Sequence, residues 1–242
     1  MFTDAHCHPF DLARILPAAE EDRRRLGVIS AASSTTREEF EYNEALAVKA
    51  RAEDAPLLLP CFAVHPQLPA ALKGEDAGND LRFSAHLEFL ETLAREGRLA
   101  AVGETGFDLY NASFRETEAV QDELFAAHLE IALRYDLPLV LHVRRAMHKI
   151  FAHKKNLKKC RSVIFHSWPG TAGEGTSLLK SGINVYFSFG AVIGLNHKEA
   201  IRCCTVFPQE HLLTETDAPY QSLRGKAFSC WGDLPAILKT AA

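Results

Sequence analysis

Two histidines stand two residues apart near the start of the chain, in the stretch DAHCH at residues 4–8. The stretch has the character of a β-strand, and alternate side chains of a strand point to one face. His6 and His8 would then present two imidazoles to the same side, as a pair of transition-metal ligands does. Taken alone, the motif fits a polar strand edge as well as half of a metal site. Its partners must lie elsewhere in the chain.

Further metal-binding side chains follow apolar runs later in the sequence, where predicted strands end: Glu104 in AVGETG, His142 in LVLHV, His166 in VIFHS and Asp217 in LLTETD. A single strand histidine is more often a hydrogen-bonded core residue than a ligand, and an acid in the place of Asp217 is often a helix N-cap. Six nitrogen and oxygen donors at the ends of five predicted strands fit poorly with chance. The coincidence favours a metal site.

Eight apolar or β-branched runs predict the strands that must position these side chains: 2–8, 28–33, 57–65, 99–106, 137–143, 162–167, 184–190 and 211–217. Helix-like segments lie between them, such as 39–53 behind a capping box at Thr36 and Glu39, 85–97 and 118–136. This alternation predicts a (β/α)₈ barrel, of the TIM type, in a single domain over residues 1–242. The polar stretches 67–83 and 223–233 are predicted loops at the face that carries the carboxyl ends of the strands.

The composition excludes several classes of protein. The 242 residues carry a net charge of -4 and are 47% hydrophobic and 24% charged, which is typical of a globular domain. No apolar run reaches the ~20 residues that cross a bilayer, and no signal peptide is recognisable, so no membrane association is expected. The six cysteines have no regular spacing. They are expected to be reduced thiols, which predicts a cytoplasmic location.

The motifs together resemble the TatD family of metal-dependent hydrolases: DAHCH at 4–8, VHP at 64–66, GETGFD at 103–108, LPLVLHVRRA at 137–146, IFHSWPG at 164–170 and ETDAPY at 215–220. The resemblance implies a TIM-like barrel with two divalent metal ions that hydrolyses phosphodiesters, commonly as a DNase. It also implies that His6, His8 and Asp217 bind one metal, that His142 and His166 bind the other, and that Glu104 bridges the two. His65 and Arg224 match positions that contact the substrate.

The chain departs from the family pattern beside these positions. It has HVRRA at 142–146 where the family has a pattern like HSRDA, and HSWPG at 166–170 where the family has one like HCFSG. Ala227 and Phe228 follow Lys226 where the family tends to have Arg-Asn. The chain keeps the residue types of the family's metal ligands but differs from the family beside them. The resemblance therefore supports the family's chemistry more strongly than it supports the family's substrate.

The expected chemistry is an attack on phosphorus by a metal-bound hydroxide, with Asp217 as ligand and base and Glu104 as the bridging carboxylate. The mixed N/O set suits Zn²⁺, Mn²⁺ or Co²⁺ more than Mg²⁺. Asp4 and Glu215, two residues before His6 and Asp217, are expected to orient these ligands or to serve as core hydrogen-bonding groups. Cys7 is expected to point to the opposite face and to pack there.

Single-stranded DNA or DNA ends are the expected substrate. Its phosphates would meet basic side chains at the mouth, namely Arg144, Arg145, Arg224 and Lys226. Its bases would stack on rings that could equally be rim packing, namely Phe107, Tyr110, Trp168 and Tyr220. The basic tract at 148–161 is expected to be a solvated outer surface.

Two other functions stay open at this point. The first is hydrolysis of a small ester, amide or phosphate, because one barrel and metal centre serve many chemistries. The second is a non-catalytic binding protein, which would have no chemical need for six ligands. No obligate protein partner is indicated.

Overall fold

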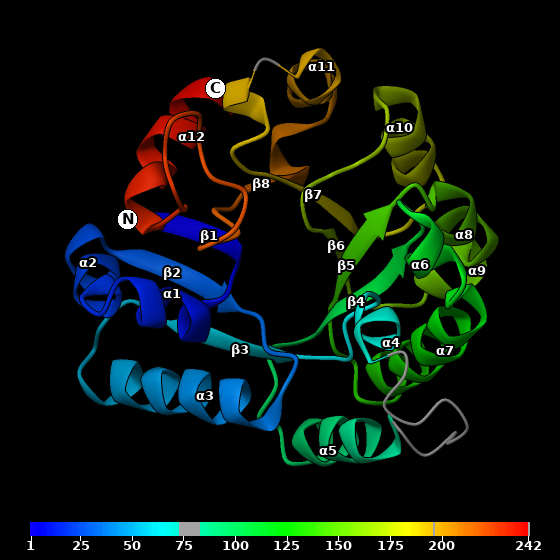
Figure 1. The fold of residues 1–242 in the computed structure, drawn as a ribbon. Helices are drawn as coiled ribbons and strands as arrows, with labels where there is room; N and C mark the ends of the chain where they lie inside the picture. The colour runs from blue at the N-terminus through cyan, green and yellow to red at the C-terminus, as the bar shows by residue number, and fades with distance from the viewer. Residues whose placement is uncertain (73–82, 196, 242) are drawn as a thin grey trace.

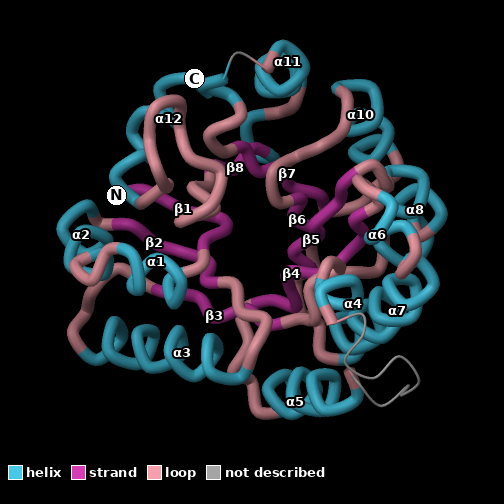
Figure 2. The backbone as a smooth tube through the Cα atoms, viewed as in Figure 1, coloured by secondary structure: helices cyan, strands magenta, loops and turns pink. Residues whose placement is uncertain are grey.

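Eight parallel strands form a ring inside a ring of helices (Figures 1 and 2). The structure is a computed structural model that describes residues 1–72, 83–195 and 197–241. The strands are β1 (Phe2–Cys7), β2 (Val28–Ala32), β3 (Leu58–Phe62), β4 (Ala101–Asp108), β5 (Leu139–Arg144), β6 (Val163–Phe165), β7 (Val185–Phe189) and β8 (Leu212–Thr214). Each strand from β1 to β7 pairs with the next strand in the chain. The predicted (β/α)₈ barrel is confirmed.

The outer layer consists of short and medium helices. The α-helices are α1 (Pro9–Ile15), α2 (Ala19–Leu26), α3 (Arg37–Ala52), α4 (Leu68–Ala71), α5 (Ser84–Arg95), α6 (Ala112–Arg115), α7 (Glu118–Arg134), α8 (Met147–Ala152), α9 (Lys154–Leu157), α10 (Ala172–Lys180), α11 (Lys198–Val206) and α12 (Leu234–Ala241). Three 3₁₀ turns complete the described part: η1 (Ile193–Leu195), η2 (Gln209–His211) and η3 (Trp231–Asp233). Every helix in these ranges is too short or too polar to traverse a bilayer.

Local sequence signals account for several of these helices. Thr36 caps α3 as predicted, because its hydroxyl accepts from the Glu39 amide while the Glu39 carboxylate accepts from the Thr36 amide. Thr171 and Glu174 form the same capping box at α10. Gly97 follows α5 with a φ of +67°, a left-handed conformation that glycine adopts without steric cost.

Several predicted strand ends are wrong, among them those at two candidate ligands. Glu104 lies in the middle of β4, which extends to Asp108, and Asp217 lies three residues beyond the end of β8. The predicted loop at 67–83 begins with the short helix α4, and its residues 73–82 lie outside the described part. The predicted loop at 223–233 ends in the 3₁₀ turn η3.

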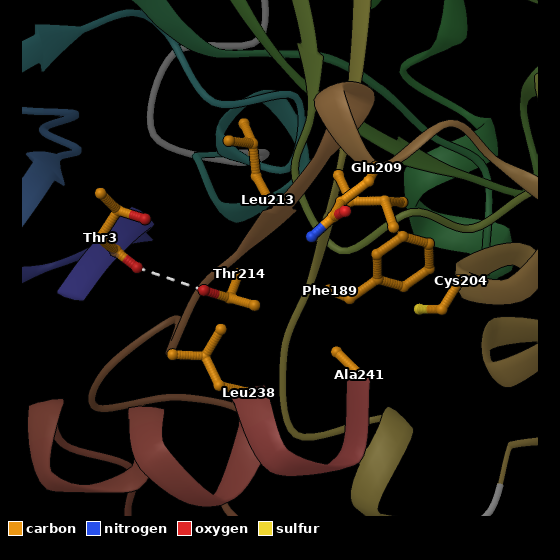
Figure 3. A pocket seen from close by; sticks show the side chains of 9 residues that line it. Thr3, Phe189, Cys204, Gln209, Leu213, Thr214, Leu238 and Ala241 are labelled. Atoms are coloured by element: carbon orange, nitrogen blue, oxygen red, sulfur yellow. Dashed lines mark hydrogen bonds between the residues drawn. The ribbon is translucent and has the colours of Figure 1, made fainter.

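The seam between β8 and β1 is closed largely by side chains and by the segment after β8. The Thr214 hydroxyl donates to the Thr3 carbonyl (Figure 3). The Asp4 carboxylate accepts from the amide and the hydroxyl of Thr216 at 2.9 and 2.7 Å. Backbone bonds from Asp217 N to His6 O and from His8 N to Ala218 O continue the join. The seam therefore fixes both histidines of the DAHCH stretch against Asp217.

The core has its largest apolar cluster on the β3–β7 side of the barrel, under the surrounding helices. Along β4, the side chains of Thr105 and Phe107 point outward to α7, where Phe107 packs on Phe125 at a ring-centroid distance of 4.7 Å. The alternate positions of the same strand, Glu104 and Asp108, contact histidines that face the barrel axis. A smaller cluster with Cys7, Leu12 and Trp231 covers the β1 side. Cys7 packs there as predicted.

His128 in α7 is a fully buried histidine that links the helix to the segment after β3 and to β4. Its Nε2 accepts from the Val64 amide at 3.0 Å, and its Nδ1 lies 3.0 Å from the Thr105 hydroxyl. Burial lowers the pKa of His128 from 6.5 to about 4, although its contact with Leu124 acts to raise it. The ring is therefore neutral, with its proton on Nδ1, because Nε2 must accept.

This buried imidazole predicts a loss of stability in mild acid. The unfolded chain binds a proton near pH 6.5 and the folded chain only near pH 4, so the contribution is complete above pH 6.5 and falls as the pH drops toward 4. At about 1.4 kcal/mol for each pKa unit, the loss is about 3 kcal/mol. His128→Gln, which keeps an acceptor and a donor without titrating, should flatten the pH dependence of unfolding free energy measured with urea. Parallel curves for the two proteins would contradict the assignment.

Candidate metal centre

Six of the predicted site residues meet at the carboxyl ends of the strands. His6 is in β1 and His8 directly follows it, Glu104 is in β4, His142 is in β5, His166 directly follows β6, and Asp217 follows β8. All six are buried except for small exposed parts of His8 and His142. The structure thus brings together the residues that the sequence placed on five separate strands.

The carboxylate of Glu104 lies between two sets of imidazoles. Its Oε2 is 3.2 Å from His6 Nε2 and 3.9 Å from His8 Nε2. Its Oε1 is 2.7 Å from His142 Nδ1 and 3.6 Å from His166 Nε2. We call the first set, with Asp217, the first ligand group, and the second set the second ligand group. One carboxylate faces both groups with different oxygens.

The first ligand group has the dimensions of a four-coordinate metal site. His6 Nε2 and His8 Nε2 are 3.1 Å apart, and Asp217 Oδ1 lies 3.6 and 3.4 Å from them. Donors bound tetrahedrally at about 2.0–2.1 Å from one ion lie about 3.3–3.4 Å from one another. The distances between these donor atoms therefore fit a shared cation.

In the second ligand group, each imidazole contacts a carboxylate through the ring nitrogen that faces away from Glu104. Asp108 Oδ2 is 3.1 Å from Nε2 of His142, so the Nδ1 of that ring is left to face Glu104. Glu215 Oε1 is 2.9 Å from Nδ1 of His166 and also accepts from the Ser167 amide. A carboxylate on the rear nitrogen fixes the tautomer and orientation of a metal-binding histidine. The orienting position predicted for Glu215 thus falls on His166 rather than on Asp217.

Asp108 is the functional residue that the sequence reasoning missed. It is fully buried at the end of β4, where Gln67 Nε2 donates to its Oδ2 and Gln121 Oε1 accepts from its amide. Asp108 lies four residues after Glu104, so the strand period of two puts both carboxylates on one face. That spacing within the GETGFD motif was the available signal.

The pKa values in the site follow from burial and from the neighbouring charges. Burial acts to raise the pKa of Glu104, but His65, His6 and His166 hold that pKa well below its usual range. Burial acts to lower the pKa of His166, but the carboxylates of Glu215, Glu104 and Asp217 raise it to about 10. Burial raises the pKa of Asp4 to about 7, although its hydrogen bonds from Thr216 act to lower it.

Four buried carboxylates in the site have only histidines as charged partners among the described residues: Glu104, Asp108, Glu215 and Asp217. No lysine or arginine of the described chain lies within 4 Å of them. Although burial acts to lower it, the pKa of His166 is raised to about 10 by three of these carboxylates, so without a cation they hold a proton on that ring. Two divalent cations would balance the four negative charges with the histidines neutral, as metal binding requires. The residues present therefore fit a group of bound cations.

His65 faces the site but has the geometry of a hydrogen-bond donor. Its Nε2 lies 3.3 Å from Glu104 Oε1, and its ring centroid lies 4.7 Å from that of His142. Its Nδ1 accepts from the Gln67 amide at 3.2 Å, so the neutral ring carries its proton on Nε2. This arrangement favours the predicted contact with substrate over metal ligation.

The predicted basic and aromatic rim is only partly formed. The Arg144 guanidinium lines the site and stacks at 3.6 Å on the ring centroid of Tyr110, with Arg145 at 4.7 Å from the same ring. Arg224 is exposed and lines neither of the two cavities at the centre, so its contact with substrate stays a prediction, and Lys226 is paired with Asp233.

The structure also decides between stacking and packing for the aromatic residues. Phe107 is buried in the core, which excludes base stacking on it in this conformation, whereas Trp168 is 5% exposed, packs on Phe165 and also lines a cavity beside the centre. Tyr110 and Tyr220 are 42% and 51% exposed and remain available to a substrate. The hydroxyl of Tyr220 donates to Asp11, and its ring lies against His8.

Gly106 allows β4 and β5 to approach beside the centre. It pairs with His142 and has a φ of +133°. A Cβ atom at this position would lie 2.1 Å from the His142 carbonyl oxygen. Only glycine fits here, between the two carboxylates of β4.

Comparisons with known proteins agree with this geometry. The family model of TatD-related DNases matches residues 3–232. An uncharacterized metal-dependent hydrolase of Mycoplasma pneumoniae is 29% identical over 234 residues, which cover 93% of this chain and 85% of that protein. The crystal structure of the TatD homolog YjjV of Escherichia coli superposes with a TM-score of 0.80 at 25% identity, covering 99% of this chain and 88% of that one.

A third relative has a more specific name. The 3'-5' ssDNA/RNA exonuclease TatD of Klebsiella pneumoniae is 33% identical over 134 residues, which cover 55% of this chain and 50% of that protein. The matched part is therefore about half the length of that relative. Because the family model spans nearly all of the sequence, the chain belongs to the TatD family of metal-dependent hydrolases.

Proposed function

We propose that this protein hydrolyses phosphodiester bonds of nucleic acid, most readily those of single-stranded DNA or DNA ends, with two divalent cations. The observation that carries the proposal is the position of Glu104, whose Oε2 faces the first ligand group while its Oε1 faces the second. The exonuclease name of a relative supports nucleic acid as the substrate class.

The residues of the site would have separate roles in phosphodiester hydrolysis. Bound divalent cations supply an activated water and neutralise a phosphoryl oxygen. Asp217 would hold one cation through Oδ1, which faces His6 and His8. Its Oδ2, which lies 3.9 Å from His166 Nε2, would accept the proton of the attacking water. A bond forms between the water oxygen and phosphorus, the bond to the leaving oxygen breaks, and that oxygen takes a proton.

The substrate phosphate would be held by hydrogen-bond donors that face the opening. His65 carries its proton on Nε2, which faces the centre, and Arg144 presents its guanidinium at the same opening. The ligand set contains four imidazoles and two carboxylates. This mixture suits Zn²⁺, Mn²⁺ or Co²⁺ more than Mg²⁺.

The proposal is tested by hydrolysis assays on metal-free and reconstituted protein. Protein stripped with a chelator should leave 5'-labelled oligonucleotides intact, and addition of Zn²⁺, Mn²⁺, Co²⁺ or Mg²⁺ should restore their shortening. Single-stranded DNA, double-stranded DNA and RNA are compared in parallel. If none is cleaved with any metal while a chromogenic ester or phosphomonoester is hydrolysed, a small-molecule substrate takes the place of nucleic acid.

A further inference from the structure

Two cavities open at the carboxyl ends of the strands and meet at the candidate metal centre. One, of about 660 Å³, contains His8, Glu104 and Asp217. The other, of about 760 Å³, extends toward the first turns of α10 and α11, and we call it the lateral pocket. Both are lined by His142, Arg144, His166 and Gln221. A bond cleaved at this junction has room for a sizeable group on each side.

The lateral pocket has the size and the walls of a small-ligand site. Its volume lies within the about 300–1,000 Å³ of typical ligand pockets. Val192 and Ala200 give it an apolar side, and Arg144 stands at its entrance from the metal centre. Ser167 donates to Gln221 across this entrance at 3.1 Å. A planar, partly apolar group linked to a phosphate fits these walls.

The far end of the lateral pocket offers one donor and one acceptor. His197 Nδ1 accepts from the Ala200 amide at 3.3 Å, so Nε2 is the ring nitrogen that is left to donate. Glu199 Oε1 accepts from the Ala172 amide at 2.8 Å, while Arg202 is the one cation within 4.0 Å of its Oε2 among the described residues. Carboxylate oxygens accept from the amino groups of bases, as Glu and Asp do with cytosine N4.

We infer that the lateral pocket binds the nucleoside on one side of the scissile phosphate and that Glu199 favours a base with an exocyclic amino group there. The inference rests on the proposed phosphodiester hydrolysis and deepens it. The protein would accordingly act on diesters that carry a large group on both sides, rather than on phosphomonoesters.

The first test compares two substrates with the same leaving group, bis(p-nitrophenyl) phosphate and methyl p-nitrophenyl phosphate. Val192→Phe fills the lateral pocket, and Val206→Phe adds the same ring at an exposed position on α11. Val192→Phe should lower kcat/KM for the bis ester about tenfold while that for the methyl ester stays within about twofold. Val206→Phe should leave the ratio of the two values unchanged. An unchanged kcat/KM for the bis ester in Val192→Phe, or an equal loss in Val206→Phe, would overturn the inference.

The second test does not depend on filling the pocket. Glu199→Gln keeps an oxygen for the Ala172 amide but replaces the free carboxylate oxygen. The wild-type protein should cleave oligo-dC and oligo-dA faster than oligo-dT, and Glu199→Gln should reduce that preference about tenfold with an unchanged thermal unfolding midpoint. An unchanged base preference would overturn the role of Glu199. If the wild-type protein cleaves no diester at all, the proposed function fails instead, so the two failures are distinguishable.

Discussion

Asp217→Asn should reduce phosphodiester hydrolysis by a factor of about 10³–10⁴, because the variant loses both a charged ligand oxygen and the proton acceptor. The substitution should leave the fold intact. Asp217 has a φ of +53°, a left-handed conformation that asparagine adopts more readily than most residues. Its amide would still donate to the His6 carbonyl. The loss is measured as kcat on a labelled oligonucleotide with saturating metal, beside the circular dichroism spectrum and unfolding midpoint.

A matched control separates the role of Asp217 from its charge. Asp11→Asn removes one negative charge from the same opening, where Asp11 accepts from the Tyr220 hydroxyl without touching a candidate ligand. It should change kcat less than about threefold, as expected of a partly exposed charge that makes no contact with the reacting atoms. A residual rate above about a tenth of wild type in Asp217→Asn would rule out its role as base.

The barrel could be predicted from the sequence because its signals are local. Near-continuous apolar runs mark buried parallel strands, and the capping box at Thr36 marks the start of α3. Strand ends were less certain, since they depend on pairing with neighbours. Glu104 lies mid-strand because Thr105, Gly106, Phe107 and Asp108 continue the pairing with β5. That continuation also places Asp108 behind His142, which the predicted end of the strand concealed.

The ligand positions could be predicted because each lies on a strand or directly beyond one, except for Asp217, which the seam with β1 holds in place. The loops could not be placed in the same way. Whether a basic loop side chain reaches the mouth depends on the path of the backbone and on competing partners. Lys226 forms an ion pair with Asp233, and Arg224 is exposed to solvent. The single-domain organisation and the cytoplasmic location stay predictions.

The aromatic residues show why type and position do not determine exposure. Phe107 is next to inward-facing residues in the sequence, yet it is buried among core rings, and Trp168 is 5% exposed between such rings and the cavity that it lines. Phe107 occupies the alternate face of β4, which α7 covers. Trp168 packs under Gly170, where an added Cβ would lie 2.4 Å from the indole. A single sequence does not show which face of each loop its neighbours cover.

For the proposed two-cation centre, Glu104→Gln should reduce the number of bound metal ions to at most one per chain and lower hydrolysis by about 10³ or more. An amide has one oxygen, so its NH₂ group would face one of the two ligand groups with a donor where a ligand is needed. Metal content is measured by elemental analysis after dialysis against a fixed free-metal concentration, and affinity by calorimetry. Two bound ions in Glu104→Gln would show that Glu104 does not bridge them.

Glu104→Asp is the control that separates the charge of the bridge from its reach. It keeps the carboxylate but draws it back by one methylene, about 1.5 Å. The oxygens of Glu104 are 2.7 Å from His142 Nδ1 and 3.2 Å from His6 Nε2, so a shorter side chain cannot keep both approaches. Glu104→Asp should therefore retain more metal than Glu104→Gln while losing most of the activity. Equal losses of metal and activity in the two variants would instead indicate that the reach of Glu104 matters and its charge does not, whereas wild-type activity in Glu104→Asp would show that charge alone suffices.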